Sequence, residues 1–210
     1  MSLRHALLAL IESGPFTGYD LMQKFEHTIE YVWRASHSQI YPELRKLEEA
    51  GLISPEVLQR SENSRSTKVA YHLTDAGRAE LTRWVEEIGT QPPVREPQYL
   101  KALYLEFSTP QNAKAQFEAH RVHFQQLRDG YRAHLQDVEN ARTELMRRRL
   151  ARSPQSEHEA IKSFKAHVYH GLIARSEAEI EWAEEGIKML DAMAASSSDP
   201  DYWNTVIHPG

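Results

Sequence analysis

The sequence predicts a mainly α-helical protein built in two parts, and three patterns along the chain support this prediction. Before residue 90, apolar residues recur three and four positions apart in several short stretches, as on one face of an amphipathic helix. Beyond residue 98 they recur every seven positions over two long stretches, which is typical of long helices that pack in pairs. Between these parts, TQPPVREPQ (Thr90–Gln98) holds three prolines and predicts an extended linker. We therefore expect a domain over residues 1–90, a linker over 91–98, a helical domain over 99–195 and a tail over 196–210.

The composition excludes several classes of protein. The 210-residue chain has no cysteine, which excludes disulfides, thiolate catalysis and cysteine-based zinc sites. No apolar run approaches the roughly 20 residues of a membrane span, and the N-terminal apolar stretch lacks a signal-peptide cleavage site. We therefore expect a cytoplasmic protein with no membrane partner.

The charge balance restricts where a nucleic acid could bind. The net charge is −5, and residues 1–90 carry ten Lys and Arg against thirteen Asp and Glu, a net charge of −3. Nucleic-acid-binding domains usually show a basic surplus. A DNA-binding face on this chain would have to be a local basic patch on an acidic domain.

Three helices are expected before residue 51. Gly14 and Pro15 end the first helix, and Thr17 is a suitable N-cap for the second. The third helix lies within ASHSQIYPELRKLEEAGLI, and Gly51 is its C-terminal stop. The apolar residues expected to be buried on these three helices are Leu3, Leu7, Leu10, Ile11, Leu21, Phe25, Ile29, Ile40, Leu44 and Leu47.

The period then changes, which predicts a β-hairpin followed by a fourth helix. LISPEVLQR and TKVAYHLT are short β-leaning segments, and the polar SENSRS between them marks the hairpin tip. Thr74 is expected to cap the fourth helix, whose buried face would hold Leu81, Trp84, Val85 and Ile88. Three helices, a hairpin and another helix follow the order of a winged helix-turn-helix.

The second part predicts an antiparallel helical hairpin. A first long helix runs from Pro110 through Leu145 and is broken by ARSPQSE, after which a second long helix begins. One hairpin buries too little apolar surface by itself, so we expect it to complete its core by dimerisation. The residues expected to support dimerisation are Phe117, Phe124, Tyr131, Val138, Leu145, Ile161, Val168, Trp182 and Met189. We further expect four apolar residues of the tail to dock on a helix: Tyr202, Trp203, Val206 and Ile207.

The motifs GYDLMQKF, SQIYPELRKLEEAGLI and YHLTDAGRAEL resemble the PadR family of bacterial transcriptional regulators. YLKALYLEF and EIEWAEEGIKMLD look like the helical dimerisation domain of its longer subfamily, which resembles virulence-gene activators. The resemblance implies a recognition helix that enters the major groove and a wing that meets phosphates. Carried over to this chain, the DNA-binding residues would be Thr17, Tyr19, Arg34, His37, Ser38, Gln39, Tyr41, Pro42, Arg45, Lys46, Arg65 and Lys68.

The resemblance also accounts for a proline inside the third helix. Proline costs about 3 kcal/mol in a helix interior, because it removes a backbone donor and crowds the preceding turn. If the recognition helix starts near Ser36 to Ser38, Pro42 lies in its second turn, where its ring stiffens the end presented to the groove. Gln39 can pair with adenine and Arg45 with guanine. The alternative is an ordinary surface helix that tolerates a proline.

We predict a homodimeric transcriptional regulator, a repressor, that reads a pseudo-palindromic operator and responds to a small hydrophobic effector. The competing hypothesis is a winged-helix protein-interaction module that does not bind DNA, which the acidic balance favours. A third hypothesis, a metal-dependent enzyme, rests on histidines three apart on a helix, for which surface positions are the simpler explanation. Aromatic residues of the helical domain fit core packing better than an effector cavity. No nucleophile elbow, phosphate loop or dinucleotide fingerprint occurs, so we expect neither enzymatic activity nor a cofactor.

Overall fold

The computed structural model describes residues 3–25, 37–58, 68–90 and 95–196 of the chain. These residues form two compact units, and each unit is assembled from two separate stretches of sequence. The first unit joins Met1–Thr90 to Ala141–Lys162, and the second joins Gln91–Asn140 to Ser163–Gly210. A segment far along the chain is thus part of the N-terminal unit.

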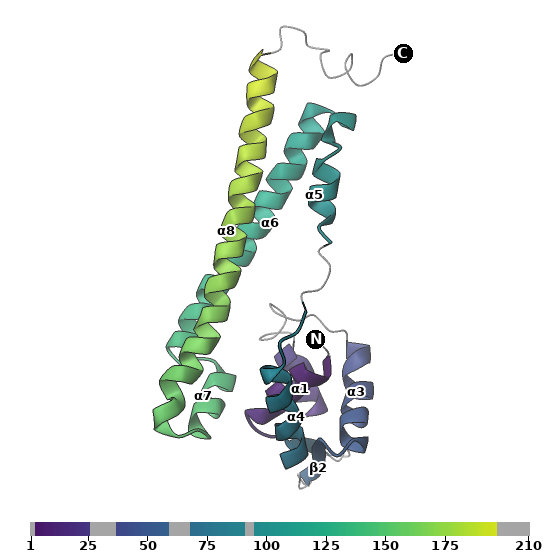
Figure 1. The fold of residues 1–210 in the computed structure, drawn as a ribbon, viewed down its shortest axis with the longest axis vertical. Coiled ribbons are helices and arrows are strands. Elements are labelled where there is room, and N and C mark those ends of the chain that lie inside the picture. Colours follow the sequence, from purple (N-terminus) through teal and green to yellow (C-terminus); the bar gives the residue numbers. More distant parts are fainter. Residues whose placement is uncertain (1–2, 26–36, 59–67, 91–94, 197–210) are drawn as a thin grey trace, which may run out of the picture. The chain divides into compact units, whose positions relative to one another are not determined.

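The first unit confirms the predicted winged-helix order (Figure 1). Its elements are α1 (Leu3–Glu12), β1 (Phe16–Thr17), α2 (Gly18–Lys24), α3 (His37–Glu49), β2 (Ile53–Leu58), β3 (Lys68–Leu73), α4 (Asp75–Glu86) and α7 (Glu144–Ala151). The apolar residues spaced along α1, α2 and α3 meet in one buried cluster, in which Leu7, Leu21 and Leu44 are fully buried. The predicted burial of Ile40, Leu44 and Leu47 is therefore confirmed. Ile29 lies outside the described residues.

Two predicted helix caps are confirmed by their hydrogen bonds. Thr17 forms a capping box with Asp20, in which the Thr17 hydroxyl accepts from the Asp20 backbone and the Asp20 carboxylate accepts from the Thr17 backbone. The Thr74 hydroxyl accepts from the Gly77 backbone at the start of α4. Gly51, after α3, has a φ of +68°, a conformation that glycine adopts without strain. These three positions fix where the helices begin and end.

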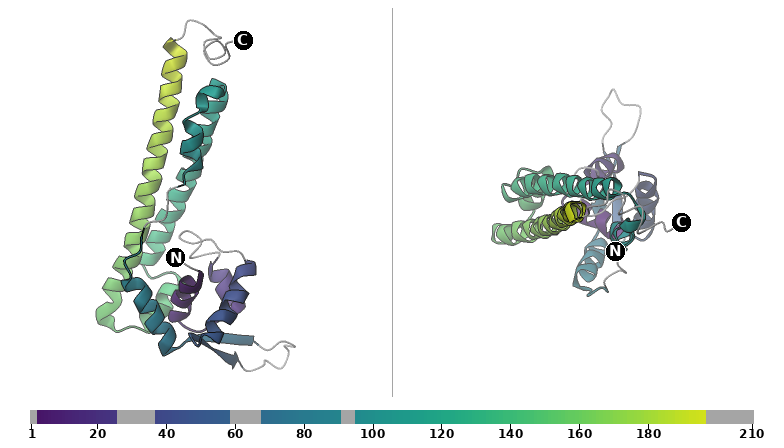
Figure 2. Two further views of the ribbon diagram at one scale, coloured as in Figure 1. Left: turned by 45° about the vertical axis from the view of Figure 1, so that its right-hand side comes forward. Right: turned by 90° about the horizontal axis from the view of Figure 1, so that it is seen from above.

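The predicted hairpin is present, and it gains a third strand. β2 and β3 pair antiparallel from Ile53 opposite Leu73 to Leu58 opposite Lys68, and their projecting end is visible in Figure 2. β1 pairs with the other edge of β3, with Phe16 opposite Tyr71. A two-residue strand is too short to leave a period-two pattern in the sequence, so β1 was not predicted. The hairpin tip, residues 61–66, lies outside the described residues.

The predicted buried face of α4 is wrong at two of its four positions. Leu81 packs on the core, and the Trp84 ring stacks on His5 with centroids 4.8 Å apart. Val85 is 70% exposed because it lies about 100° further round the helix than Trp84. Ile88 is 99% exposed because α4 ends at Glu86 and the following backbone is extended.

The second unit is helical, as predicted. It contains α5 (Pro97–Ala102), the short 3-10 helix η2 (Leu105–Phe107), α6 (Pro110–Glu139) and α8 (His158–Ser196) from Ser163 onward. α6 and α8 lie side by side in both Figure 1 and Figure 2. The predicted tail residues 202, 203, 206 and 207 lie outside the described residues.

The first long helix ends earlier than predicted. α6 stops at Glu139, and the turn that follows has Ala141 at a φ of +50°. Thr143 then caps a separate helix, α7, by accepting from the Met146 backbone. The prediction that one helix continues through Leu145 was therefore wrong. The seven-residue spacing continues past the turn as far as Leu145, but Leu145 belongs to the first unit and packs on the core of that unit.

Two glycines make a matched test of the packing. A Cβ on Gly77 would lie 2.0 Å from the Leu52 carbonyl oxygen, and a Cβ on Gly171 of α8 would meet nothing within 4 Å. We expect Gly77→Ala to lower the free energy of unfolding by about 3 kcal/mol, through overpacking against backbone. Gly171→Ala should raise it by about 0.5–1 kcal/mol, because glycine is unfavourable inside a helix. Urea unfolding of both variants measures this, and equal effects would contradict the close approach of α4 to Leu52.

Candidate nucleic-acid interface

The exposed side of α3 is polar, and its opposite side is fully apolar. Ile40 and Leu44 are completely buried. Turned away from them, five residues named from the sequence are exposed: Ser38, Gln39, Tyr41, Pro42 and Arg45. We call these five the α3 edge. It supplies an amide, two hydroxyls and a guanidinium, which are groups that hydrogen-bond base edges in a major groove.

Pro42 lies in the second turn of α3 and is exposed. It has no N–H to donate to the carbonyl of Ser38, so one hydrogen bond of the helix is absent there. The ring faces away from the core, so the proline does not contribute to packing of the buried side. This position leaves the ring available for an external contact.

Tyr41 has a packing role that the sequence did not reveal. A Cβ on Gly18 would lie 2.7 Å from Cε1 of Tyr41, so the tyrosine ring covers the first residue of α2. Gly18 thereby allows α2 and α3 to approach closely. Tyr41 as a whole remains 47% exposed, so it both packs on Gly18 and presents an outer edge to solvent.

The start of α2 presents Tyr19 beside this contact. Tyr19 is exposed, and its hydroxyl accepts a 2.9 Å hydrogen bond from Gln23 one turn later. The Thr17 hydroxyl is occupied by the capping box with Asp20. In this structure Thr17 therefore positions α2.

The cations of the interface differ in their partners. Arg45 is exposed and forms no hydrogen bond or ion pair within the part of the chain that the structure describes. Lys46 lies 3.5 Å from Glu43, and Lys68 is exposed at the outer end of the wing strand β3, opposite Leu58. Arg34 and Arg65 lie outside the described residues, and only the backbone of His37 is described. Among the described residues, Arg45 is thus the cation of α3 without an acidic partner that DNA would have to displace.

The wing strands add an acidic group and a link to α3. Glu56 of β2 contacts the His72 ring on β3, and both are exposed. The pKa of Tyr71 on β3 is raised, first by burial and then by Glu48 and Tyr41, while Arg45 lowers it. Tyr71 therefore lies within electrostatic range of the α3 edge. Tyr71 also packs against the core that contains the buried side of α3.

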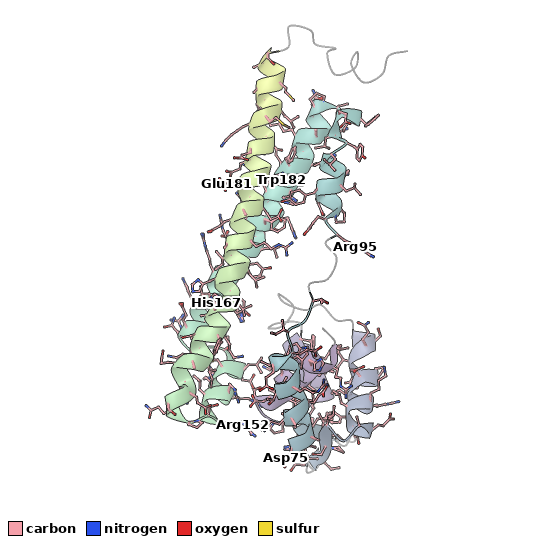
Figure 3. The ribbon with its side chains drawn as sticks, in the orientation of Figure 1. Asp75, Arg95, Arg152, His167, Glu181 and Trp182 are labelled. Atoms are coloured by element: carbon pink, nitrogen blue, oxygen red, sulfur yellow. The ribbon has the colours of Figure 1, made fainter. Side chains whose placement is uncertain are left out.

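In the second unit, a cavity of about 260 Å³ is lined by residues of α5, η2, α6 and α8, among them the rings of Phe117, His120 and Trp182. Trp182 projects from α8 towards α5 (Figure 3) and packs against Tyr99 and Phe117, with ring centroids 4.4 and 5.1 Å apart. Glu179 is buried and accepts a 3.0 Å hydrogen bond from the Tyr99 hydroxyl, and a His120 ring nitrogen lies 2.9 Å away. Burial and Glu179 raise the pKa of Tyr99. The cavity is lined by Pro97, Gln98, Lys101, Ala102, Leu105, Gln116, Phe117, Ala119, His120 and Trp182.

Comparison with known proteins follows the division into two parts. The PadR-like family of transcriptional regulators matches residues 7–83, and the virulence activator alpha C-terminal family matches residues 94–191. Together the two matches cover most of the chain. The chain belongs to the PadR-like family of transcriptional regulators.

Two relatives resemble this PadR-like chain in sequence, and a third resembles it in structure. It is 35% identical over 119 residues to the negative transcriptional regulator PadR of Bacillus subtilis, covering 55% of this chain and 63% of that one. It is 40% identical over 88 residues to the regulator Rv1176c of Mycobacterium tuberculosis, covering 41% of this chain and 45% of that one. The matched regions thus span less than two thirds of both relatives. The virulence activator AphA of Vibrio cholerae has a similar structure, with 27% identity, a TM-score of 0.63, and coverage of 91% of this chain and 99% of that one.

Two solved structures of the Bacillus subtilis PadR hold ligands. One is a complex with operator DNA, with 28% identity, a TM-score of 0.63, and coverage of 90% of this chain and 98% of that one. The other is a complex with p-coumaric acid, with 29% identity, a TM-score of 0.59 and the same coverage.

The residues predicted to support dimerisation differ in their burial in this PadR-like chain, and Leu145, one of them, packs on the core of the first unit. Phe117, Tyr131 and Val138 are buried within the second unit. Phe124, Ile161 and Trp182 are half-buried, whereas Val168 and Met189 are exposed. Larger exposed apolar residues, which the heptad pattern did not single out, lie elsewhere in this unit: Leu100, Leu103, Tyr104, Phe107 and Phe164.

The histidines considered as metal ligands have other surroundings. His120 lies against Glu179 and Trp182, and the His123 ring packs on Phe124. His167 and His170 are exposed on α8. Within the described ranges, no group of three or more His, Cys, Asp or Glu is placed to hold a metal ion. Among the same residues, no helix is both long and apolar enough to cross a membrane.

Proposed function

We propose that this protein is a DNA-binding transcriptional regulator that reads an operator through α3. The observation that carries the proposal is the α3 edge on a helix whose other side is fully buried. There Arg45, which has no ion-pair partner in the described part of the chain, lies among exposed polar groups. The region that matches the PadR-like family contains α2, α3 and the wing. A relative whose structure includes operator DNA supports the same role for this chain.

The regulator acts as a homodimer and a repressor in this proposal. Exposed Leu103 and Phe107 form an apolar surface of a kind that usually marks an interface. A dimer presents two copies of α3, which suits a pseudo-palindromic operator. Repression is the role in the name of the Bacillus subtilis relative, a negative regulator.

A small aromatic effector is a second part of the proposal. The cavity is lined by the aromatic rings of Phe117 and Trp182 and by polar side chains such as Gln98, which suits a planar ligand with a polar end. A related PadR has a structure with p-coumaric acid, a ligand of that shape. The competing hypothesis, an interaction module that binds no DNA, keeps the support of the acidic charge balance.

Fluorescence anisotropy with DNA from upstream of the protein's own gene tests the proposal. We expect binding at least a hundredfold tighter than to random DNA of equal length at the same salt concentration, since specific complexes exceed nonspecific ones by at least that factor. The slope of log affinity against log salt should be modest, because the charge of the N-terminal domain is −3. Equal affinity for both DNAs would favour the interaction module.

Lys68→Ala should weaken both DNAs alike. Lys68 is exposed at the outer end of the wing strand β3, where a phosphate contact carries no base information. We expect the salt slope to become shallower by about one unit for each phosphate that the lysine no longer neutralises. Lys188→Ala, an exposed lysine on α8, is the matched control and should leave both affinities unchanged. A change of sequence preference in Lys68→Ala would contradict a phosphate contact.

A further inference from the structure

α7 belongs to the first unit, although more than fifty residues of sequence separate it from α4, the element of that unit that precedes it. Leu145 packs on the core formed by α1, α2 and α3, and Met146 is 1% exposed. Thr143 caps α7 and so starts it as a helix separate from α6. α7 is therefore seated by its own apolar residues and does not merely continue the long helix.

Ion pairs attach α7 to the first and second helices of the unit. Glu144 contacts Lys24, the last residue of α2, and also lies 2.8 Å from Arg148. Hydrogen bonding by Lys24 is the largest cause that lowers the pKa of Glu144. The Glu144 carboxylate is thus charged at neutral pH and holds the end of α2.

A second ion pair reaches the end of α1. Arg149 contacts Glu12, whose side chain is only 12% exposed, and Arg78 of α4 lies 3.4 Å from the same carboxylate. One acidic group therefore connects α1, α4 and α7. A partly buried carboxylate with two guanidinium partners loses more when one partner is removed than an exposed pair would.

Arg148 contacts the turn between α1 and α2. Its guanidinium lies 4.6 Å from the centre of the Phe16 ring, and it donates a 3.4 Å hydrogen bond to the Pro15 carbonyl. Phe16 belongs to β1, which pairs with the wing strand β3. α7 thus contacts the end of α1, the strand β1 and the end of α2.

α7 also changes the charge of the unit. Residues 141–162 carry six Lys and Arg against three Asp and Glu, a net charge of +3. Since residues 1–90 carry −3, the assembled unit is neutral. The acidic balance that argued against DNA binding is therefore compensated by a segment from the second half of the chain.

We infer that α7 is a positioning element of the DNA-reading unit and that operator affinity depends on its ion pairs. This inference rests on the proposed DNA binding. The start of α2 is covered by Tyr41 of α3, and the end of α2 is held by Glu144 of α7. Releasing α7 would let α2 move and would loosen the contact that orients α3. Residues that do not contact DNA would thereby determine the affinity for the operator.

Glu144→Gln separates positioning from a general effect of charge. The substitution removes a negative charge, so electrostatics alone would strengthen DNA binding. We expect operator affinity to fall about fivefold in the dimer, because two weakened pairs act together. We also expect amide hydrogens of α2 to exchange about threefold faster in the free protein. Glu144 is partly exposed, so the variant should fold, and its circular dichroism checks this.

A pair of arginine variants supplies the matched control. Arg149→Gln and Arg147→Gln each remove one positive charge from α7, but the Arg147 side chain is exposed and, among the described residues, donates to the Arg142 carbonyl and to no other element. We expect Arg149→Gln to weaken operator binding at least threefold more than Arg147→Gln, and only Arg149→Gln to speed exchange in α2. The inference is overturned if Glu144→Gln and Arg149→Gln both leave α2 exchange at the wild-type rate. That outcome is independent of DNA, so it refutes the positioning of α2 by α7 whether or not the proposed function holds. A wild type that binds no operator would refute the proposed function and, with it, the dependence of operator affinity on α7.

Discussion

Arg45→Ala should weaken operator binding by at least about thirtyfold, with a much smaller loss on random DNA. A bidentate contact from arginine to guanine contributes about 1–3 kcal/mol per subunit, and a two-fold site contains two such contacts. Arg45 forms no ion pair with the described residues, so its removal leaves no buried charge behind. The loss should therefore appear in binding and not in folding. Anisotropy titrations on both DNAs, beside urea unfolding, measure the two effects separately.

Lys46→Ala is the matched control for that experiment. It removes the neighbouring cation of the same helix, which lies 3.5 Å from Glu43 and is directed to a partner within the protein. We expect a loss of severalfold at most, and of similar size on both DNAs. If Arg45→Ala loses equally on operator and random DNA, Arg45 contacts phosphate and α3 does not read bases through it.

Tyr41→Ala should show a mixed result, because the structure gives Tyr41 two roles. Its ring packs over Gly18 and its outer edge is exposed. We expect the substitution to lower operator affinity by about 1–3 kcal/mol per subunit and also to lower the free energy of unfolding, through the space left over α2. Unchanged unfolding in Tyr41→Ala would show that the packing contact contributes little.

Local patterns predicted the elements of the reading unit well. Thr17 and Thr74 were identified as caps because a hydroxyl before an amphipathic run satisfies the free N–H groups of a helix start. The buried side of α3 followed from its three- and four-residue spacing. These features depend on residues within one or two turns of each other, which is the range that a single sequence reports.

Contacts between distant segments could not be predicted in this way. Leu145 continues the seven-residue pattern of α6, yet it belongs to the first unit and packs on the core of that unit. The cap residue Thr143 was the one local signal of a new helix, and Ala141 at positive φ gave none. The exposure of Val85 and Ile88 likewise depends on where α4 ends. For the candidate site, the polar side of α3 was predictable, but the contact of Tyr41 with Gly18 was not.

Loss of the dimer should have the largest effect of all the predicted changes. The structure indicates that this prediction is best tested at exposed residues outside the seven-residue pattern. Leu103 and Phe107 are 71% and 67% exposed near the start of α6, whereas Val138 is buried and its replacement by a charge would unfold the protomer. We expect the wild type to sediment as a dimer of 24.2 kDa chains at micromolar concentration. The double variant Leu103→Asp, Phe107→Asp should raise the dimer dissociation constant at least about a thousandfold, because two charges buried without partners cost about 4 kcal/mol or more.

Gln126→Asp controls for an added charge on the same unit. Gln126 is exposed on α6 and polar, so its replacement should leave the dimer intact. The double variant should keep the helical circular dichroism of the wild type, since both side chains are exposed in the protomer. As a monomer it holds one copy of α3 and should lose most of its preference for a two-fold operator, because half-sites are then bound independently. A double variant that remains dimeric would place the interface elsewhere on the second unit. A monomeric wild type would remove the dimer from the proposed function and leave α3 to read a single half-site.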